Sequence, residues 1–558
     1  MMSTLRIIHI KVVFTVLVFI LTSLFLGGCE DSPMNETNSN QGTVDPTIIA
    51  SPPDEQWAVD EQPGTVYYEI FVRAFADSNG DGIGDFNGVT AKLDYLQELG
   101  IGGIWLMPIN ASPSYHGYDV TDYYAVNPEY GTMDDLEHLL AEAHKREIEV
   151  IMDLVVNHTS NKHPWFKASS EEKDGPYRNW YTWVESDTSK PSDGATGSNP
   201  WHRLNGEHYL GIFWGGMPDL NFDHPAVREE MLKIGQFWLE LGMDGFRLDA
   251  AKHIYGDFKS SESKPETVEK NLEWWQAFRE DMNKVKDDAY IIGEVWDSPV
   301  VVAPYLDKFD SAFNFELAGK LIGAAQSESA AEFAFSLNRI FGLFEKTSSG
   351  SFIDAPFLAN HDQNRVMSVL KDNTDHAKMA ASLLLTMPGN PFIYYGEEIG
   401  MKGMKPDEYI REPMVWGEED SASVKASTWI VTKHNEDTVD VESQMKDPNS
   451  LYQHYRQLIA WRNQIPALSN GGIAEFISYN KDDGKIAIAN KAIAAFERVA
   501  EQEKVLVVHN LSGEEQQLAL TGPEGSQRYT KILQASKGTA RVDGDLVHLP
   551  PYSTAILQ

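Results

Sequence analysis

The chain has 558 residues, of which 83 are acidic and 46 basic, and its formal net charge at pH 7 is −37. Because phosphate binding needs clustered lysine and arginine, this excess of acid argues against nucleic acid or an anionic surface as a partner. The 14 tryptophans, 22 tyrosines and 25 phenylalanines suffice for a large globular body with one or two smaller domains. A single cysteine excludes an internal disulfide.

The first 28 residues have the pattern of an export signal. Arg6 and Lys11 precede an apolar run over 12–26, which is short for a membrane span of about 20 apolar residues. Two glycines then precede Cys29, and the stretch resembles a bacterial lipoprotein signal, in which this cysteine is lipidated after cleavage. We therefore expect residues 1–28 to be a signal peptide and the exported protein to meet the membrane only through a lipid on Cys29, at the cell surface or the periplasmic face. A plain secretory signal with an incidental cysteine is the alternative.

Residues 29–56 are expected to form a tether, because they are rich in Asn, Ser, Thr, Pro and acid and contain too few large apolar side chains for a core. After this tether, short apolar runs alternate with helical patterns. Gly100 is expected to end one helix and Thr132 to cap another. Eight strands in β-then-α order favour an α/β fold of the (β/α)₈ TIM-barrel type over an open doubly wound sheet. The expected strands are 66–72, 103–107, 150–156, 245–249, 290–294, 312–315, 353–359 and 391–395.

Two stretches depart from this alternation. The first follows the third strand and is rich in Trp, Asn, Ser, Gly and charge, and its length exceeds that of an ordinary loop, which predicts an inserted domain. The second contains short strands such as 505–509 and 554–557 between turn residues, which predicts a C-terminal antiparallel β-sandwich. The predicted boundaries are 57–158 and 217–466 for the barrel, 159–216 for the inserted domain and 467–558 for the sandwich.

Three acidic residues, Asp249, Glu294 and Asp362, stand at the C-terminal ends of apolar runs. Parallel α/β folds carry their chemistry at those strand ends. Cleaving a glycosidic bond with retention requires two carboxyl groups about 5 Å apart, and Asp249 and Glu294 end consecutive strands. Arg247 shares the strand face of Asp249 and is placed to hold that carboxylate ionised. The sequence therefore predicts a glycosidase site.

Six ordered blocks resemble the conserved blocks of the α-amylase family of glycoside hydrolases. They are Asp153-Leu-Val-Val-Asn-His158, Met217-Pro-Asp-Leu-Asn221, Gly245-Phe-Arg-Leu-Asp249, Gly293-Glu-Val-Trp296, Asn360-His-Asp362 and Gly389-Asn-Pro-Phe-Ile-Tyr-Tyr-Gly396. The resemblance implies that Asp249 is the nucleophile, Glu294 the general acid/base and Asp362 the transition-state stabiliser. It also implies a substrate-binding set made of Tyr118, Asp119, His158, Arg247, Lys252, His253, His361 and Arg365.

A glycine-rich acidic loop follows the first expected strand. Its oxygen side chains recur at alternate positions, a spacing that suits Ca²⁺, although the loop lacks the twelfth-position Glu of an EF-hand. A solvated acidic turn is the alternative. The expected calcium ligands of this loop are Asp77, Asn79, Asp81, Ile83 and Asp85. The family resemblance implies a second calcium, between the barrel and the inserted domain, held by Asn157, Asp219 and the carbonyl of His253.

The catalytic set alone does not choose an activity within this family. Ala250 after the nucleophile, followed by Lys252 and His253, looks like α-1,4-specific amylases, whereas relatives acting on α-1,6 bonds usually have a valine there. We therefore expect an endo-acting α-amylase, a monomer acting on starch, maltodextrins and maltooligosaccharides. Asp119 keeps an exo-acting α-glucosidase or oligo-1,6-glucosidase open, and a neopullulanase, a 4-α-glucanotransferase and a non-catalytic glucan-binding lipoprotein are further alternatives.

Overall fold

The computed structural model describes residues 64–331, 333–348, 350–417, 424–480, 485–487, 489–522 and 528–558. The chain divides into two units, 1–55 and 56–558, and every described residue belongs to the second. The expected signal peptide and the whole of the expected tether, including Cys29, lie outside the described residues. Within the described ranges, no helix combines the length and apolarity that crossing a membrane requires.

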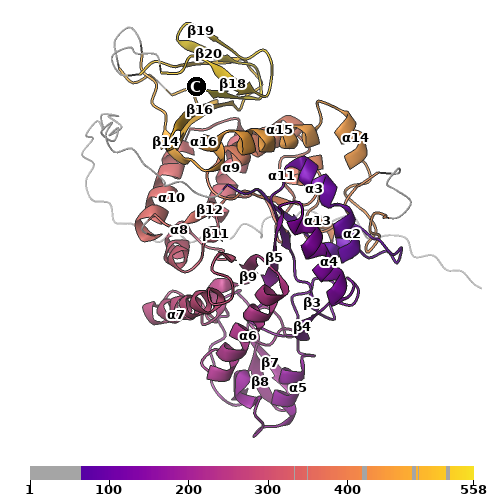
Figure 1. Cartoon of the computed structure of the whole chain (residues 1–558). Helices are drawn as coiled ribbons and strands as arrows, with labels where there is room; N and C mark the ends of the chain where they lie inside the picture. The colour runs from indigo at the N-terminus through magenta and orange to yellow at the C-terminus, as the bar shows by residue number, and fades with distance from the viewer. Residues whose placement is uncertain are drawn as a thin grey trace, which may run out of the picture. The chain divides into compact units, whose positions relative to one another are not determined.

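Eight short parallel strands form the barrel, as the sequence predicted (Figure 1). Neighbours in the barrel are neighbours in the chain, and β13 pairs with β1. Hydrogen bonds from Asn390 N to Asp354 O and from Phe392 N to Pro356 O join β12 to β13 and close the ring. The strands are β1 Tyr67–Ile70, β2 Gly103–Leu106, β5 Glu149–Leu154, β9 Gly245–Leu248, β10 Tyr290–Gly293, β11 Ser311–Phe313, β12 Ile353–Ala355 and β13 Phe392–Tyr394.

Aromatic rings fill the barrel interior. Tyr67 stacks between Phe392 and Tyr290, at centroid distances of 4.9 and 5.2 Å. Trp105 and Phe313 continue this cluster, and each is almost fully buried. Such a packed core is typical of an eight-stranded barrel, and it holds the strand ends at fixed positions.

Helices surround the strands (Figure 1), and their ends follow local sequence signals. Thr132 and Asp135 form a reciprocal capping box at the start of α4, and Gly100 ends α3 in the left-handed conformation, both as expected. The longer helices are α2 Phe86–Ala91, α3 Leu93–Leu99, α4 Met133–His144, α5 Pro164–Glu171, α6 Pro225–Leu241, α7 Pro265–Met282, α9 Phe315–Ser327, α10 Phe333–Ser348, α12 Thr374–Thr386, α14 Val441–Lys446 and α15 Leu451–Gln464. The single turns are α1 Val72–Phe75, η1 Arg178–Trp180, η2 Ala251–His253, α8 Pro299–Val302, η3 Ala303–Asp307, α11 Val366–Val369, η4 Glu397–Ile399, α13 Asp407–Ile410 and α16 Pro466–Ser469.

The stretch after β5 has its own small sheet. Strands β6 Trp183–Glu185, β8 Glu207–Leu210 and β7 Trp201–Leu204 lie in that order and pair antiparallel. A separate hairpin, β3 Asn110–Ala111 with β4 Asp122–Val126, precedes α4. Isolated bridges between His158 and Asp219 and between Tyr181 and Leu220 fasten the stretch where it leaves and re-enters the barrel.

The C-terminal part consists of two antiparallel sheets, as the sequence predicted. The larger has the order β14-β15-β16-β21-β18 and the smaller β17-β20-β19. Leucine and valine side chains from both sheets, among them Leu506, Val547 and Leu549, form the core between them. The strands are β14 Gly472–Glu475, β15 Ile493–Ala500, β16 Glu503–Asn510, β17 Gln516–Ala519, β18 Ile532–Ala535, β19 Arg541–Asp543, β20 Leu546–Leu549 and β21 Ser553–Leu557.

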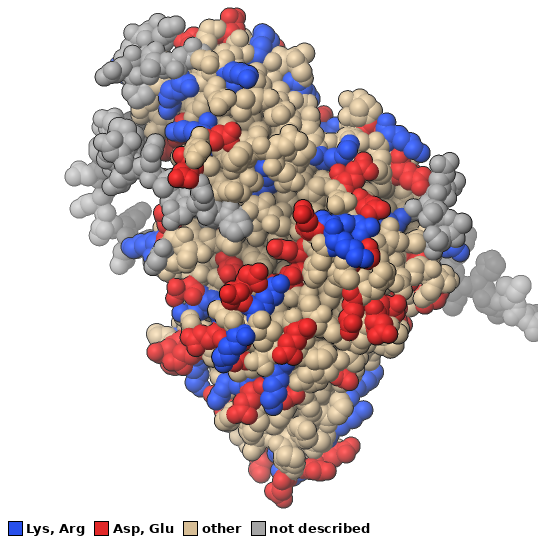
Figure 2. Space-filling model, viewed as in Figure 1, with Lys and Arg blue, Asp and Glu red and all other residues tan. Residues whose placement is uncertain are grey.

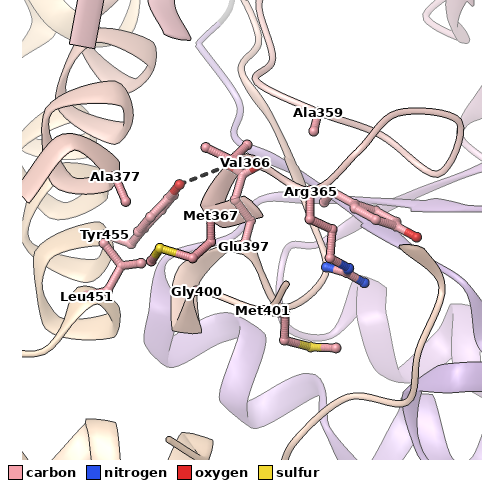
Figure 3. A pocket seen from close by; sticks show the side chains of 11 residues that line it. Ala359, Arg365, Val366, Met367, Ala377, Glu397, Gly400, Met401, Leu451 and Tyr455 are labelled. Carbon is pink, nitrogen blue, oxygen red and sulfur yellow. Dashed lines mark hydrogen bonds between the residues drawn. The ribbon is translucent and has the colours of Figure 1, made fainter. Parts of the chain in front are cut away.

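A small cavity behind β13 contains a buried acid, Glu397 (Figure 3). The cavity measures about 10 Å³, close to the room that one water needs. Tyr455 donates a hydrogen bond of 2.9 Å to Glu397 Oε1, whereas Oε2 has no hydrogen-bond partner in the described part of the chain. Burial raises the pKa of Glu397 to about 8, although the Tyr455 bond opposes the rise. The folded protein therefore keeps Glu397 protonated near neutral pH.

We expect Glu397→Gln to change how stability depends on pH. Between its ordinary pKa of 4.5 and about 8, Glu397 keeps a proton in the folded state that the unfolded chain releases. The wild type therefore loses stability as pH rises, by up to about 1.4 kcal/mol per pH unit from this group. The variant lacks the group, so its melting temperature should rise relative to the wild type between about pH 5 and pH 8. If the melting temperatures of Glu397→Gln and the wild type changed in parallel with pH, this assignment would be contradicted. The exposed control Glu171→Gln is expected to give such a parallel curve.

Candidate functional site

The guanidinium of Arg247 is the centre of the site. Arg247 lies on β9, is fully buried and donates from Nη1 to Asp153 Oδ1 at 2.8 Å and to Asp249 Oδ1 at 2.6 Å. Its Nη2 lies 2.9 Å from Glu294 Oε2, an ion-pair distance without hydrogen-bond geometry. The predicted pairing of Arg247 with Asp249 is therefore present, and the same cation also brings Glu294 and Asp153 together.

The chain turns sharply after Asp249. Ala250 has a positive φ of 48°, in the left-handed region that side chains other than glycine seldom occupy. This turn aims the main-chain N–H of Ala250 at Glu294 Oε2, at 3.0 Å, and Ala251 N donates to Glu294 O at 3.0 Å. The ends of β9 and β10 are thus tied together, which fixes Asp249 relative to Glu294.

Both carboxyl groups are buried but reachable, with Asp249 7% and the Glu294 side chain 11% exposed. Burial raises the pKa of Glu294, and the charges of Asp249 and Asp362 add to that rise, although Arg247 opposes it. Burial also raises the pKa of Asp249, against the charge and the hydrogen bond of Arg247. Glu294 is therefore suited to carry a proton that it can donate.

Asp362 has a different electrostatic environment. Burial by itself would raise its pKa, but His361, Arg411 and Arg247 hold the pKa of Asp362 well below its usual range. His361 Nε2 lies 3.1 Å from Asp362 Oδ2, and Arg411 Nη2 donates to Oδ1 at 2.9 Å. Asp362 is therefore ionised, and its side chain is 30% exposed.

The predicted residues Tyr118 and His158 lie within this site. Tyr118 donates to Asp153 Oδ2 at 3.0 Å, and its ring stacks on His361 at a centroid distance of 5.6 Å. Burial lowers the pKa of His158 to about 4, so its imidazole is neutral near pH 7. Its Nε2 has no hydrogen-bond partner among the residues that the structure describes, and a sugar hydroxyl would supply one.

Asp119 is adjacent to Tyr118 but its carboxylate is already occupied. Ser112 donates to Asp119 Oδ1 at 2.8 Å, Ser114 donates to the same oxygen, and Ser160 donates to Oδ2 at 3.4 Å. The residue is buried. These hydroxyls hold the carboxylate within the protein.

Lys252, His253 and Arg365 lie in different surroundings. Lys252 Nζ donates to Asp297 Oδ2 at 2.8 Å, and the His253 ring pairs with Gly256 O at 3.0 Å. Arg365 instead donates to the carbonyls of Ile410 and Tyr395 and lines the cavity of Glu397 (Figure 3). These contacts indicate a structural part for Arg365, whose substrate-binding role stays a prediction.

Two exposed aromatic rings flank the site. Trp296, two residues after Glu294, is 47% exposed and stacks on Phe315 at 4.6 Å with an angle of 9° between the rings. Phe213, from the stretch after β5, lies 5.4 Å from His158 and 5.9 Å from His253, measured between ring centroids. Flat, exposed rings of this kind suit the apolar faces of sugar rings.

The expected calcium loop is folded around its own acidic side chains. Asp77 Oδ1 accepts from the main-chain N–H groups of Asn79 and Gly80, and Asp81 Oδ1 accepts from Ile83 N. Asp85 caps α2 through Gly88 N. No group of three or more His, Cys, Asp or Glu residues converges as a metal site in the described ranges, so any cation here would need amide and carbonyl oxygens as well.

The residues expected to hold a second calcium do meet. Asn157 donates from its amide nitrogen to His253 O at 2.8 Å, and Leu220, next to Asp219, donates its N–H to Asn157 O. Asp219 Oδ1 is buried without a hydrogen-bond partner among the described residues, and burial and the nearby charge of Asp257 raise its pKa well above normal. Oδ2 of Asp219 accepts from Ile212 N, which leaves Oδ1 as a buried oxygen that a hard cation could use.

The sequence analysis did not predict a function for three residues of the site. Asp153 was noted only as the start of a motif, but it binds both Arg247 and Tyr118. Arg411 contacts Asp362, which is 49 residues away in sequence. Glu69 contacts His361, which is 292 residues away. Glu69 stands on β1, inside an apolar run, and this position was its only signal.

The arrangement suits acid-assisted displacement at a carbon atom. Glu294, whose pKa is raised, and Asp249, paired with Arg247, follow neighbouring strands, and the charge of Asp362 acts on both. Glu294 can supply a proton and Asp249 an attacking oxygen. Asp362 can stabilise positive charge that develops on the reacting carbon.

Comparison with known proteins agrees with this geometry. The family model of the alpha amylase catalytic domain matches residues 69–471, and that of the alpha-amylase SusG C-terminal domain matches residues 493–556. Alpha-amylase 3 of Dictyoglomus thermophilum is 43% identical over 498 residues, which cover 88% of this chain and 93% of that protein. Alpha-amylase SusG of Bacteroides thetaiotaomicron is 31% identical and aligns with 88% of this chain and 92% of its own length.

The crystal structure of the alpha-amylase from H. orenii superposes with a TM-score of 0.79 at 42% identity, covering 89% of this chain and 99% of that one. Relatives with other activities also match, among them an oligo-1,6-glucosidase from Parageobacillus thermoglucosidasius at 34% identity and a 4-alpha-glucanotransferase from Thermotoga neapolitana at 33%. The catalytic model and these relatives extend over most of the chain, and the carboxylates stand at the strand ends of the barrel. The chain belongs to the α-amylase family of glycoside hydrolases.

Proposed function

We propose that the protein is an endo-acting α-amylase that hydrolyses α-1,4-glucosidic bonds of starch, maltodextrins and maltooligosaccharides with retention. The observation that carries the proposal is the pairing of Asp249 and Glu294 through Arg247, opposite an ionised Asp362. The similarity of the chain to several proteins named alpha-amylase supports the choice of substrate.

The proposal gives each carboxyl group a role. Glu294 gives its proton to the glycosidic oxygen while Asp249 attacks the anomeric carbon, so the bond from carbon to leaving oxygen breaks as a bond to Asp249 forms. Water then attacks the same carbon, Glu294 accepts its proton, and the bond to Asp249 breaks. Asp362 stabilises the positive charge that develops on the sugar in both steps. Activity should therefore fall as pH rises through the raised pKa of Glu294.

Two features of the site support attack within a long chain. Three serines already occupy the Asp119 carboxylate, which argues against its gripping a chain end as in exo-acting relatives. Trp296, stacked on Phe315, offers a flat ring beyond Glu294, on which a further sugar can rest.

On the face shown in Figure 2, basic side chains lie among acidic ones, which suits a neutral glucan better than a polyanion.

Products from soluble starch and from maltotriose test the proposal. We expect protein lacking residues 1–29 to destroy the iodine colour of starch quickly and to release a mixture of short maltooligosaccharides, because an endo-acting enzyme cuts inside chains. Glu294→Gln, which cannot give up or take a proton, should lose about 10²- to 10⁴-fold in kcat. Chromatography of the earliest products measures both effects.

Each other product pattern would overturn the assignment in a defined way. Glucose as the sole early product would indicate an exo-acting glucosidase, and products longer than maltotriose would indicate a 4-α-glucanotransferase. Cleavage of α-1,6 bonds in preference to α-1,4 bonds would indicate an oligo-1,6-glucosidase or a neopullulanase. No turnover by the wild type would leave a glucan-binding lipoprotein.

We also propose that the protein binds Ca²⁺ at two places, the loop of Asp77 to Asp85 and the group of Asn157, Asp219 and His253 O. The oxygen-rich loop and the buried Asp219 Oδ1, which has no hydrogen-bond partner among the described residues, support this proposal. Bound calcium would supply positive charge that compensates these buried acids and would hold the stretch after β5 against the barrel.

Calcium should therefore stabilise the protein by binding only the folded state. Chelator-treated protein should melt at a lower temperature, and added Ca²⁺ should restore the melting temperature. Calorimetric titration should find two equivalents, of which Asp81→Asn and Asp219→Asn each remove one because each loses a ligand charge. The exposed control Asp174→Asn should keep both. No calcium-dependent change in melting temperature or heat of binding would contradict both sites.

The proposed location follows from the N-terminal sequence. We propose that the protein is exported and anchored through a lipid on Cys29, with residues 29–56 as a tether. Starch is too large to cross a cytoplasmic membrane, so an amylase held outside it would degrade the polymer to fragments that can be imported. Cys29 lies outside the residues that the structure describes.

A further inference from the structure

Glu69 is a buried carboxylate for which the mechanism above has no role. It stands on β1, is 1% exposed, and its Oε1 lies 2.6 Å from His361 Nδ1 and accepts from His361 N at 3.4 Å. On the other side of the same ring, His361 Nε2 lies 3.1 Å from Asp362 Oδ2. The imidazole thus bridges two carboxylates that come from opposite ends of the barrel sequence.

The hydrogen bonds around this ring require hydrogens on both of its nitrogens. Burial raises the pKa of Glu69, but the charge of His361 and the hydrogen bond between the two side chains oppose that rise. In its ionised form the Glu69 carboxylate only accepts, so Nδ1 then donates to it. Tyr118 gives its hydroxyl hydrogen to Asp153, so the contact between Tyr118 Oη and Nε2 requires Nε2 to donate as well. A neutral imidazole carries one N–H and would turn a lone pair toward Glu69 or toward Asp362.

We propose that Glu69 is a positioning residue that keeps His361 doubly protonated, so that Nε2 donates its one hydrogen to Tyr118 and the positive imidazolium lies 3.1 Å from the Asp362 carboxylate. This inference rests on the proposed function, which places Asp362 at the reacting sugar. Glu69 itself lies behind the histidine and acts through it. The role differs from that of Asp153, which holds Arg247.

The surrounding charges agree with a charged His361. Burial lowers the pKa of His361, but Asp362 and Glu69 outweigh that effect and raise the pKa to about 9. The other charged groups near the ring come from several elements. They are Asp153 of β5, Arg247 of β9, Asp249 after β9 and Arg411, whose Nε donates to His361 O. Removing Glu69 alone leaves Asp362 as the main support of that charge.

Glu69→Gln tests the proposal because the amide keeps the size of Glu69 and an oxygen that Nδ1–H can reach. Without the negative charge, His361 should lose its second proton at a pH about 1 to 3 units lower. In the wild type Glu294 sets the alkaline limb of kcat/KM on a small chromogenic maltooligosaccharide. In Glu69→Gln the loss of the His361 proton should come first and move this limb to lower pH. Glu149→Gln, which removes a carboxylate bonded to Tyr67 on β1 but far from His361, is the matched control and should leave the limb in place.

Nuclear magnetic resonance of protein labelled at the histidine Cε1 carbon gives a readout that does not need activity. The His361 signal, identified by its absence in His361→Gln, should keep the imidazolium shift from about pH 6 to pH 8 in the wild type and titrate in Glu69→Gln. An imidazolium shift retained in Glu69→Gln, or a uniform loss of activity without a moved limb, would overturn the proposal. Failure of the proposed function would appear separately, in the products of the wild type.

Discussion

The burial of Arg247 is the constraint on which the site depends. Its guanidinium is fully buried inside the barrel, and such a cation is tolerated only when acids and hydrogen bonds surround it. Asp153 and Asp249 supply them, and Glu294 adds a third carboxyl group. The pairing register sets Asp153 directly beside Arg247 on the neighbouring strand, so the sheet itself delivers the first partner. Removing one partner would leave an uncompensated charge.

The same cation produces the asymmetry that the chemistry needs. The carboxyl groups of Asp249, Glu294 and Asp362 lie near Arg247, and they do not share the nearby positive charges equally. Asp362 has His361 and Arg411 in direct contact, whereas Glu294 only shares Arg247 with other acids. A proton added to the cluster therefore goes to Glu294 before Asp362, which agrees with the opposite directions of their pKa shifts.

Much of the fold and of the candidate site could be predicted from the sequence, because the spacing of apolar residues and short sequence motifs are local signals. Apolar runs marked all eight barrel strands, and the acids after them marked the carboxyl groups that the structure brings together. Glu69 and Arg411 could not be found this way, since their partners come from distant segments and closure of the barrel alone brings them together. Arg365 shows the reverse: the family resemblance placed it among the substrate-binding residues, but its guanidinium donates to main-chain carbonyls.

The C-terminal sheets are connected to the site by a chain of buried contacts. Arg498 of β15 donates to Thr386 O at the end of α12, and Arg462 of α15 donates to Met387 O and Gly389 O in the segment that leads into β13. After β13, Tyr395 N donates to Glu69 O at 3.0 Å. Buried arginines on carbonyls resist displacement, because each carbonyl would lose its partner without gaining water. The sandwich therefore holds the end of α12, and α15 holds the segment that leads from α12 into β13, whose following residue is joined to the strand of Glu69.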